Sequence, residues 1–136
     1  MKMTRASTYA LTALAHLARE KPTAPVASHD MAAAANGIPE RFLLKVLRPL
    51  VSVGILRSIK GPHGGYTLAR PAKDVTLLEV IEAVDGPMRG DAPIIGTDKA
   101  DGFDKRLATI CDQATALVRE RLAQVTLAEL ARAKGK

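Results

Sequence analysis

Residues 38–70, with the sequence IPERFLLKVLRPLVSVGILRSIKGPHGGYTLAR, decide the fold. Apolar side chains recur at helical spacing over the first third, and Pro39 is a residue type that favours the first position of a helix. Residues 55–60 then alternate between apolar and polar side chains, as a short strand does, and residues 66–69 return after the glycine-rich segment 61–65. The stretch therefore predicts a helix followed by a β-hairpin.

The predicted helix has one apolar and one basic side. Its buried side is expected to comprise Phe42, Leu43, Val46, Leu47 and Leu50. Three cations at spacings of four and three project from another side, namely Arg41, Lys45 and Arg48. Such a stripe suits a helix in the major groove of DNA, although an ordinary solvated surface has the same pattern. Pro49 removes one hydrogen bond inside the helix, so we expect a kink or a change of helix geometry there.

The hairpin tip favours the DNA interpretation of that stripe. Lys60, His63 and Arg70 flank the tip and are placed to reach phosphates or a minor groove. A glycine-rich loop also cradles nucleotide phosphates in some proteins, but such a loop lies between a strand and a helix. Here a strand follows the loop, which argues against nucleotide binding. A basic helix followed by this hairpin predicts a winged helix-turn-helix, a module that binds DNA.

Charge is divided unevenly along the chain. Residues 1–74 hold 11 Lys and Arg against 4 Asp and Glu, a net charge of +7. Residues 75–136 hold 9 against 10, a net charge of −1. A basic first part suggests a polyanionic partner for that part alone, the alternative being a charged surface that only keeps the protein in solution.

Composition limits the class of protein. The 136 residues suffice for one domain plus an appendage. Because 47% of the residues are apolar but only 3% are aromatic, the core must consist of Ala, Leu, Val and Ile. This composition favours helices. No apolar run approaches the roughly 20 residues that span a membrane, and the first residues lack the apolar centre of a signal peptide. We therefore expect a cytoplasmic, mainly α-helical protein with a small β-hairpin wing. The single cysteine, Cys111, excludes an internal disulfide.

Five further helices are predicted around the central stretch. Two precede it, over residues 5–20 with Thr4 as N-cap and over residues 29–35 with Ser28 as N-cap. Three follow it, over residues 77–84, 104–124 and 127–133, the first and last of them opened by the capping boxes Thr76–Glu79 and Thr126–Glu129. Residues 87–103 are expected to form a loop. The chain then divides into a winged helix-turn-helix domain (1–74), a linking helix with a sensor loop (75–103) and a dimerisation part (104–136).

The long helix over 104–124 carries apolar residues at heptad-like spacing. They are Phe103, Leu107, Ile110, Ala114, Leu117 and Leu122. A long helix with such a seam suggests a homodimer that is held by helix–helix packing, and packing against its own domain is the alternative.

Six segments together resemble one bacterial family, the Rrf-type winged-helix transcription regulators (the IscR, NsrR and CymR kind). They are Thr4 to Leu11, Ile38 to Leu43, Leu50 to Ser58, Lys60 to Pro71, Val75 to Gly86 and Val125 to Leu130. The most specific is KGPHGGYTLARP in the hairpin. The resemblance covers nearly the whole chain except residues 87–103.

The resemblance implies a homodimer with crossed long helices, which binds a two-fold-symmetric operator of double-stranded DNA. We expect the protein to act there as a repressor or another kind of transcription regulator. The predicted basic helix would occupy the major groove and the hairpin the minor groove. On these positions the family's DNA contacts fall on Thr4, Arg5, Ser28, Arg41, Lys45, Arg48, Lys60, Gly61, His63, Gly64 and Gly65.

Two departures from the family pattern matter. Members that bind an iron–sulfur cluster carry three cysteines in and just after the loop that precedes the long helix, and this chain has none there. Cys111 alone does not supply the roughly four ligands of a cluster, so we expect no cluster and no other metal or cofactor. In addition, Leu44 stands where many members have an acidic residue, so base recognition through that acid does not carry over.

Alternatives to DNA binding stay open. The loop and the cleft beside it would suit a small-molecule or protein effector, and Cys111 is either a redox sensor or a buried core residue. A protein-interaction adaptor that keeps the winged fold is the second class of function. An enzyme is disfavoured because His16, His29 and His63 fall in separate elements and no nucleophile has a base beside it.

Overall fold

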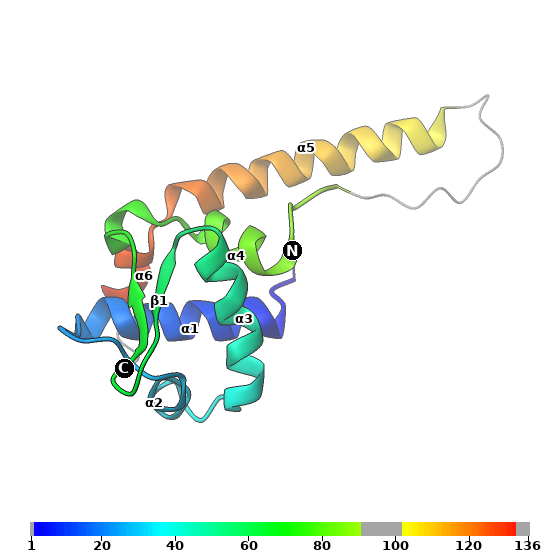
Figure 1. Ribbon diagram of the computed structural model, residues 1–136. Coiled ribbons are helices and arrows are strands. Elements are labelled where there is room, and N and C mark those ends of the chain that lie inside the picture. Colours follow the sequence, from blue (N-terminus) through cyan, green and yellow to red (C-terminus); the bar gives the residue numbers. More distant parts are fainter. Residues whose placement is uncertain (1, 91–101, 133–136) are drawn as a thin grey trace.

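The computed structural model describes residues 2–90 and 102–132. It is mainly helical with one small hairpin, as predicted (Figure 1). The elements are α1 (Arg5–Glu20), α2 (Ser28–Ala34), α3 (Glu40–Ser52), β1 (Leu56–Ile59), β2 (Gly65–Leu68), the 3₁₀ turn η1 (Ala72–Asp74), α4 (Leu77–Asp85), α5 (Phe103–Gln124) and α6 (Leu127–Arg132). Residues 91–101 of the expected loop, and the chain after Arg132, lie outside the described residues.

Helix α1 is the centre of the core. It contacts α2, α3, α4, α6 and β2, and eight of its sixteen residues are buried. Most of those eight are alanine or leucine, and the small alanines let the neighbouring helices approach closely. The predicted N-cap is confirmed, since the Thr4 hydroxyl accepts a hydrogen bond from the backbone N–H of Ser7 at 3.0 Å.

Helix α3 packs onto α1 through four buried side chains, Leu43, Val46, Leu47 and Leu50. The prediction that Phe42 belongs to this buried face is wrong, because its side chain remains 49% exposed at the edge where α3 meets α1. We expected a kink or a change of helix geometry at Pro49, and of these two the change to another helix geometry does not occur, because the helix stays α-helical through Pro49 to Ser52.

The predicted N-cap of α2 is also wrong. The helix begins one residue early, at Ser28, and Ala27 occupies the N-cap position without a side-chain hydrogen bond. The Ser28 hydroxyl instead donates to the Glu40 carboxylate at 2.7 Å. This bond ties α2 to the first turn of α3, which fixes the relative position of the two helices of the helix-turn-helix.

The end of the chain returns to the same core. The backbone N–H of Leu77 donates to Val125 at 2.9 Å, and that of Leu127 donates to Val75 at 2.7 Å, so the segments before α4 and after α5 pair in antiparallel fashion. Both capping boxes lie at this junction, and the one at Thr76 and Glu79 is complete. Buried residues of α4 and α6 join those of α1 and α3 in one hydrophobic core.

Helix α5 extends well beyond this core (Figure 1). None of its 22 residues is buried. Arg119 is joined to the α4 helix by an ion pair with Glu82, and the backbone at Gly90 runs so close to α5 that an added Cβ would lie 2.5 Å from the Cys111 carbonyl oxygen. No helix in the described part of the chain is long and apolar enough to cross a membrane.

Candidate nucleic-acid interface

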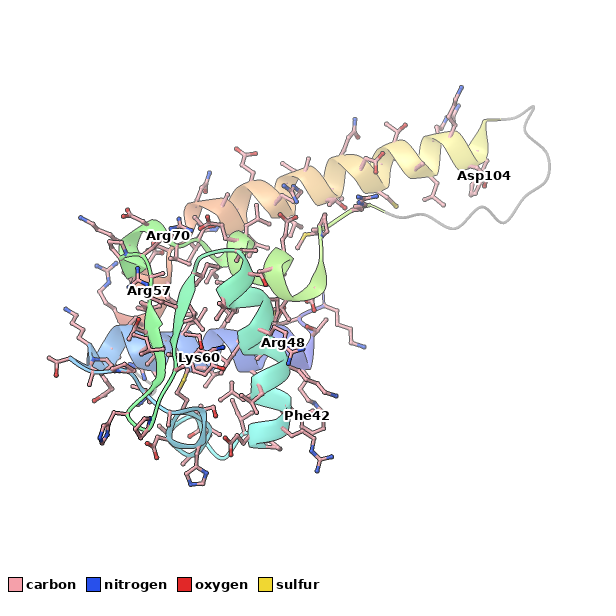
Figure 2. The ribbon with its side chains drawn as sticks, viewed as in Figure 1. Phe42, Arg48, Arg57, Lys60, Arg70 and Asp104 are labelled. Atoms are coloured by element: carbon pink, nitrogen blue, oxygen red, sulfur yellow. The ribbon has the colours of Figure 1, made fainter. Side chains whose placement is uncertain are left out.

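The basic stripe of α3 points directly away from the core. At about 100° per residue, Arg41, Lys45 and Arg48 are centred about 180° from the four buried side chains of the helix. All three cations are exposed, and among the described residues none of them has an acidic partner. The buried leucines hold the backbone of α3 rigidly, so the stripe is presented on a fixed scaffold. Figure 2 shows Arg48 on this helix.

The hairpin forms the predicted wing beside this helix. Its strands are antiparallel, with Leu56 opposite Leu68 and Ile59 opposite Gly65. Residues 61–64 make the turn, in which the Gly64 N–H donates to the Gly61 carbonyl at 3.0 Å. Lys60 and His63 are exposed at the tip and are available to a polyanion.

Two of the wing glycines have a packing reason for being glycine. A Cβ on Gly64 would lie 2.0 Å from the Ile59 carbonyl oxygen, and a Cβ on Gly65 would lie 2.4 Å from that of Val26. The second approach exists because Val26 pairs with Tyr66 through two backbone hydrogen bonds of 2.9 and 3.0 Å. These glycines therefore shape the wing whether or not they touch DNA.

Arg70, which the sequence places to reach phosphates or a minor groove, is paired within the protein instead. Its guanidinium group pairs with the Glu79 carboxylate at 3.1 Å and donates to the Asp74 carbonyl at 2.6 Å. Burial raises the pKa of the Glu79 carboxyl, but hydrogen bonds from Thr76 and the Arg70 ion pair more than offset this and lower that pKa below its ordinary value of 4.5. Arg70 thus fastens the base of the wing to α4.

The residues outside α3 and the wing that were expected near phosphates differ in whether their polar groups already have partners within the protein. The Thr4 hydroxyl donates to the Asp85 carboxylate at 2.9 Å, where the buried Ser7 hydroxyl also donates at 2.7 Å. The Ser28 hydroxyl is occupied by Glu40. Arg5, by contrast, is exposed and forms no ion pair within the described residues.

The predicted seam of α5 divides into two sides. Ile110 and Leu117 are 59% and 69% exposed, and Phe103 and Ala114 lie on the same exposed side. The side chains that are partly covered by the protein's own chain are Leu107, Cys111, Val118 and Leu122. Ile110 and Leu117 on the first side are thus more exposed than the side chains of the second.

The comparisons with known proteins identify the family. The profile of the Rrf2 family, described as "Iron-dependent Transcriptional regulator", matches residues 3–133. The Mycobacterium tuberculosis protein Rv1287, provisionally named an HTH-type transcriptional regulator, is 33% identical over 96% of this chain and 81% of its own length. Protein Rrf2 of Nitratidesulfovibrio vulgaris is 32% identical over 97% of this chain and 88% of that protein.

The residues of this chain do not fit the iron in that description. An iron–sulfur cluster takes about four ligands, most of them cysteine thiolates, and the sequence has one cysteine, on α5. The described residues contain no group of three or more His, Cys, Asp or Glu side chains that would hold a metal ion. No step of DNA recognition is therefore assigned to a metal.

The fold agrees with the family. CymR of Bacillus subtilis, described as its global cysteine regulator, superposes with a TM-score of 0.78 at 25% identity over 99% of both chains. A protein of Listeria innocua, provisionally named a transcriptional regulator, gives 0.77 at 29% identity over 100% of this chain and 90% of its own. These relatives are transcription regulators and not enzymes. The chain belongs to the Rrf2 family of winged-helix, DNA-binding transcription regulators.

Proposed function

We propose that the protein is a homodimeric, cytoplasmic repressor that binds a two-fold-symmetric operator without an iron–sulfur cluster. In each half-site α3 lies in the major groove and the wing enters the minor groove. The observation that carries this proposal is the stripe of Arg41, Lys45 and Arg48, which is exposed, lacks acidic partners and lies opposite the buried face of a rigid helix. Lys60 and His63 on the wing and Arg5 on α1 extend the same cationic surface.

The homodimer rests on α5. An exposed apolar stripe on a helix that projects from the core is costly in water unless a second chain covers it. Ile110 and Leu117 are seven residues apart, as in a helix–helix seam. Within this proposal residues 1–74 bind DNA, residues 104–136 dimerise and residues 75–103 connect the two.

An effector has a candidate location between these parts. A pocket of about 470 Å³ lies where the N-terminus, the end of α4 and α5 meet, and its lining includes Met3, Met88 and Val118. A small molecule there would contact the residues that precede α1, the end of α4 and α5 together, so its binding would change the geometry between the DNA-binding and dimerising parts. Oxidation of Cys111 is the other route, and a Cys111→Ser variant whose DNA binding still responds to peroxide would exclude it.

The test is fluorescence anisotropy with the DNA upstream of the protein's own gene. Affinity is expected to fall steeply with salt, because each phosphate contact releases counterions. Lys45→Ala and Lys60→Ala should each weaken binding by about tenfold and reduce the salt slope by about one. Lys105→Ala, which removes the same charge from the exposed side of α5 away from Ile110 and Leu117, serves as the matched control and should change little.

A protein-interaction adaptor is the second candidate. It is favoured by two apolar side chains that α3 leaves exposed, Phe42 at 49% and Leu44 at 41%. Binding to a protein partner, combined with equal affinity for the upstream region and for unrelated DNA of the same length, would establish the adaptor and end the repressor proposal.

A further inference from the structure

Phe42 occupies an unusual position for an aromatic residue. It is the third residue of α3, and its ring stays half exposed although Leu43, Val46 and Leu47 beside it are buried. The ammonium group of Lys45 lies 5.8 Å from the centre of the ring, a cation–π distance. The ring is thus held next to the basic stripe and not within the core. Figure 2 shows Phe42 near the start of α3, with Arg48 further along the same helix.

The ring forms one wall of a small pocket between α3 and the start of α1. The pocket has a volume of about 220 Å³, and we name it the Phe42 pocket. It is lined by Arg5, Ala6, Tyr9, Phe42, Lys45 and Val46. The small side chain of Ala6 leaves space beside the ring. Arg5 and Lys45 are exposed, so an apolar interior is bordered by two cations.

This combination matches one chemical group of DNA. The 5-methyl group of thymine is the distinctive apolar group in the major groove, and apolar side chains such as Phe recognise it by contact. The backbone phosphates near that methyl group are anions, which suits the two cations at the border of the pocket. The first residues of a recognition helix are also those that reach the base edges.

We propose that the Phe42 pocket receives the 5-methyl group of one thymine in each half-site of the operator. This inference rests on the proposed function and deepens it. Phe42 would make the operator sequence-specific at that position through an apolar contact, whereas Lys45 and Arg5 would supply affinity that is largely independent of sequence.

The test uses duplexes of the footprinted operator in which each thymidine in turn is replaced by deoxyuridine, which lacks only the methyl group. At one symmetric position the wild-type protein should lose about fourfold in affinity for each methyl group removed. Phe42→Ala removes the contact in both half-sites at once, so the variant should bind the unmodified operator about 16-fold more weakly, and it should be insensitive to deoxyuridine at that position. Phe42→Leu, which keeps an apolar side chain, should retain part of the sensitivity.

Val53→Ala provides the matched control, because Val53 is a similarly exposed apolar residue at the other end of α3, outside the pocket. It should respond to deoxyuridine as wild type does, and circular dichroism melting should show that every variant is folded. A wild-type protein that tolerates every single deoxyuridine, or a Phe42→Ala variant that remains as sensitive as wild type, would overturn the inference while leaving the repressor proposal standing. Absence of operator-specific binding by wild type would instead remove both.

Discussion

Helices α3 and α5 are both amphipathic, yet their apolar faces find partners in different places. α3 buries Leu43, Val46, Leu47 and Leu50 against its own chain. α5 buries none of its 22 residues, and two of its large apolar side chains, Ile110 and Leu117, are more than half exposed. The candidate DNA-binding surface therefore lies within one chain, whereas we propose that a second chain covers the exposed apolar stripe of the long helix. Membership of the family supports a DNA-binding role for the winged part that contains α3, and the dimerising role of α5 is our proposal.

The largest expected effect concerns α3, the helix whose apolar face is buried within its own chain. Leu47→Ala should lower the free energy of unfolding by about 2–5 kcal/mol, because it leaves a cavity where a fully buried side chain was. Leu44→Ala on the same helix removes the same atoms from an exposed position and should cost less than about 0.5 kcal/mol. Urea titration followed by circular dichroism measures both, and equal losses would mean that α3 is not fixed by its core face.

The second effect concerns α5, the helix whose apolar stripe is exposed. Leu117→Glu places a charge in the exposed stripe and should convert the dimer to a monomer without unfolding it, because no α5 residue is in the buried core. Affinity for a two-half-site operator should fall by about 100-fold or more when the two DNA-binding parts are no longer linked. Sedimentation velocity and anisotropy measure these changes. Lys105→Glu introduces a charge on the opposite side of α5 and should preserve the dimer, and a dimeric Leu117→Glu would contradict the proposed seam.

A smaller effect is expected in the wing. Gly64→Ala would place a Cβ 2.0 Å from a backbone carbonyl oxygen, so the hairpin has to shift. We expect a loss of stability of about 1–3 kcal/mol and weaker operator binding with the dimer intact. Pro62→Ala, in the exposed part of the same turn, is the control and should be close to wild type. Thermal melting measures the stability of both variants and anisotropy measures their operator binding. If Gly64→Ala matched Pro62→Ala in both, the wing geometry described above would be wrong.

The smallest effect is the pH dependence of the contact at the base of the wing. The folded protein lowers the pKa of Glu79 below 4.5, so ionised Glu79 stabilises the fold at neutral pH. This contribution is complete above pH 4.5 and is lost as the pH falls through the lowered pKa. It should amount to less than about 1 kcal/mol, because the carboxylate is partly exposed. Glu79→Gln should remove this part of the acid dependence of unfolding, and an unchanged acid limb would exclude the contribution.

Features that depend on neighbouring residues in the sequence could be predicted. The bounds of α1 and the capping box of Thr76 and Glu79 follow from residues within one helical turn, and the structure has both as predicted. The hairpin and the basic stripe of α3 follow from alternation and helical spacing in the same way. Local patterns were sufficient for the winged fold and for the candidate DNA-binding face.

Features that depend on a distant partner could not be predicted. Phe42 was expected in the core because it borders the apolar face, but α1 presents the small Ala6 opposite it and leaves the ring uncovered. Ser28 was expected to cap its own helix, but the carboxylate of Glu40 lies within hydrogen-bonding distance. Arg70 was expected to meet phosphates, but Glu79 on another element pairs with it. In each case the competing group lies about ten or more residues away in the sequence, and only the fold brings it close.

The central claim is that two self-contained DNA-binding parts are joined through α5. Hydroxyl-radical footprinting of the upstream DNA tests it most directly, with wild type and Leu117→Glu compared at the same concentration. The account predicts two equivalent protected segments whose centres lie about one helical turn of DNA apart, or a multiple of it, and their joint loss in the variant. A single protected segment, or two segments that persist with a monomeric Leu117→Glu, would contradict it.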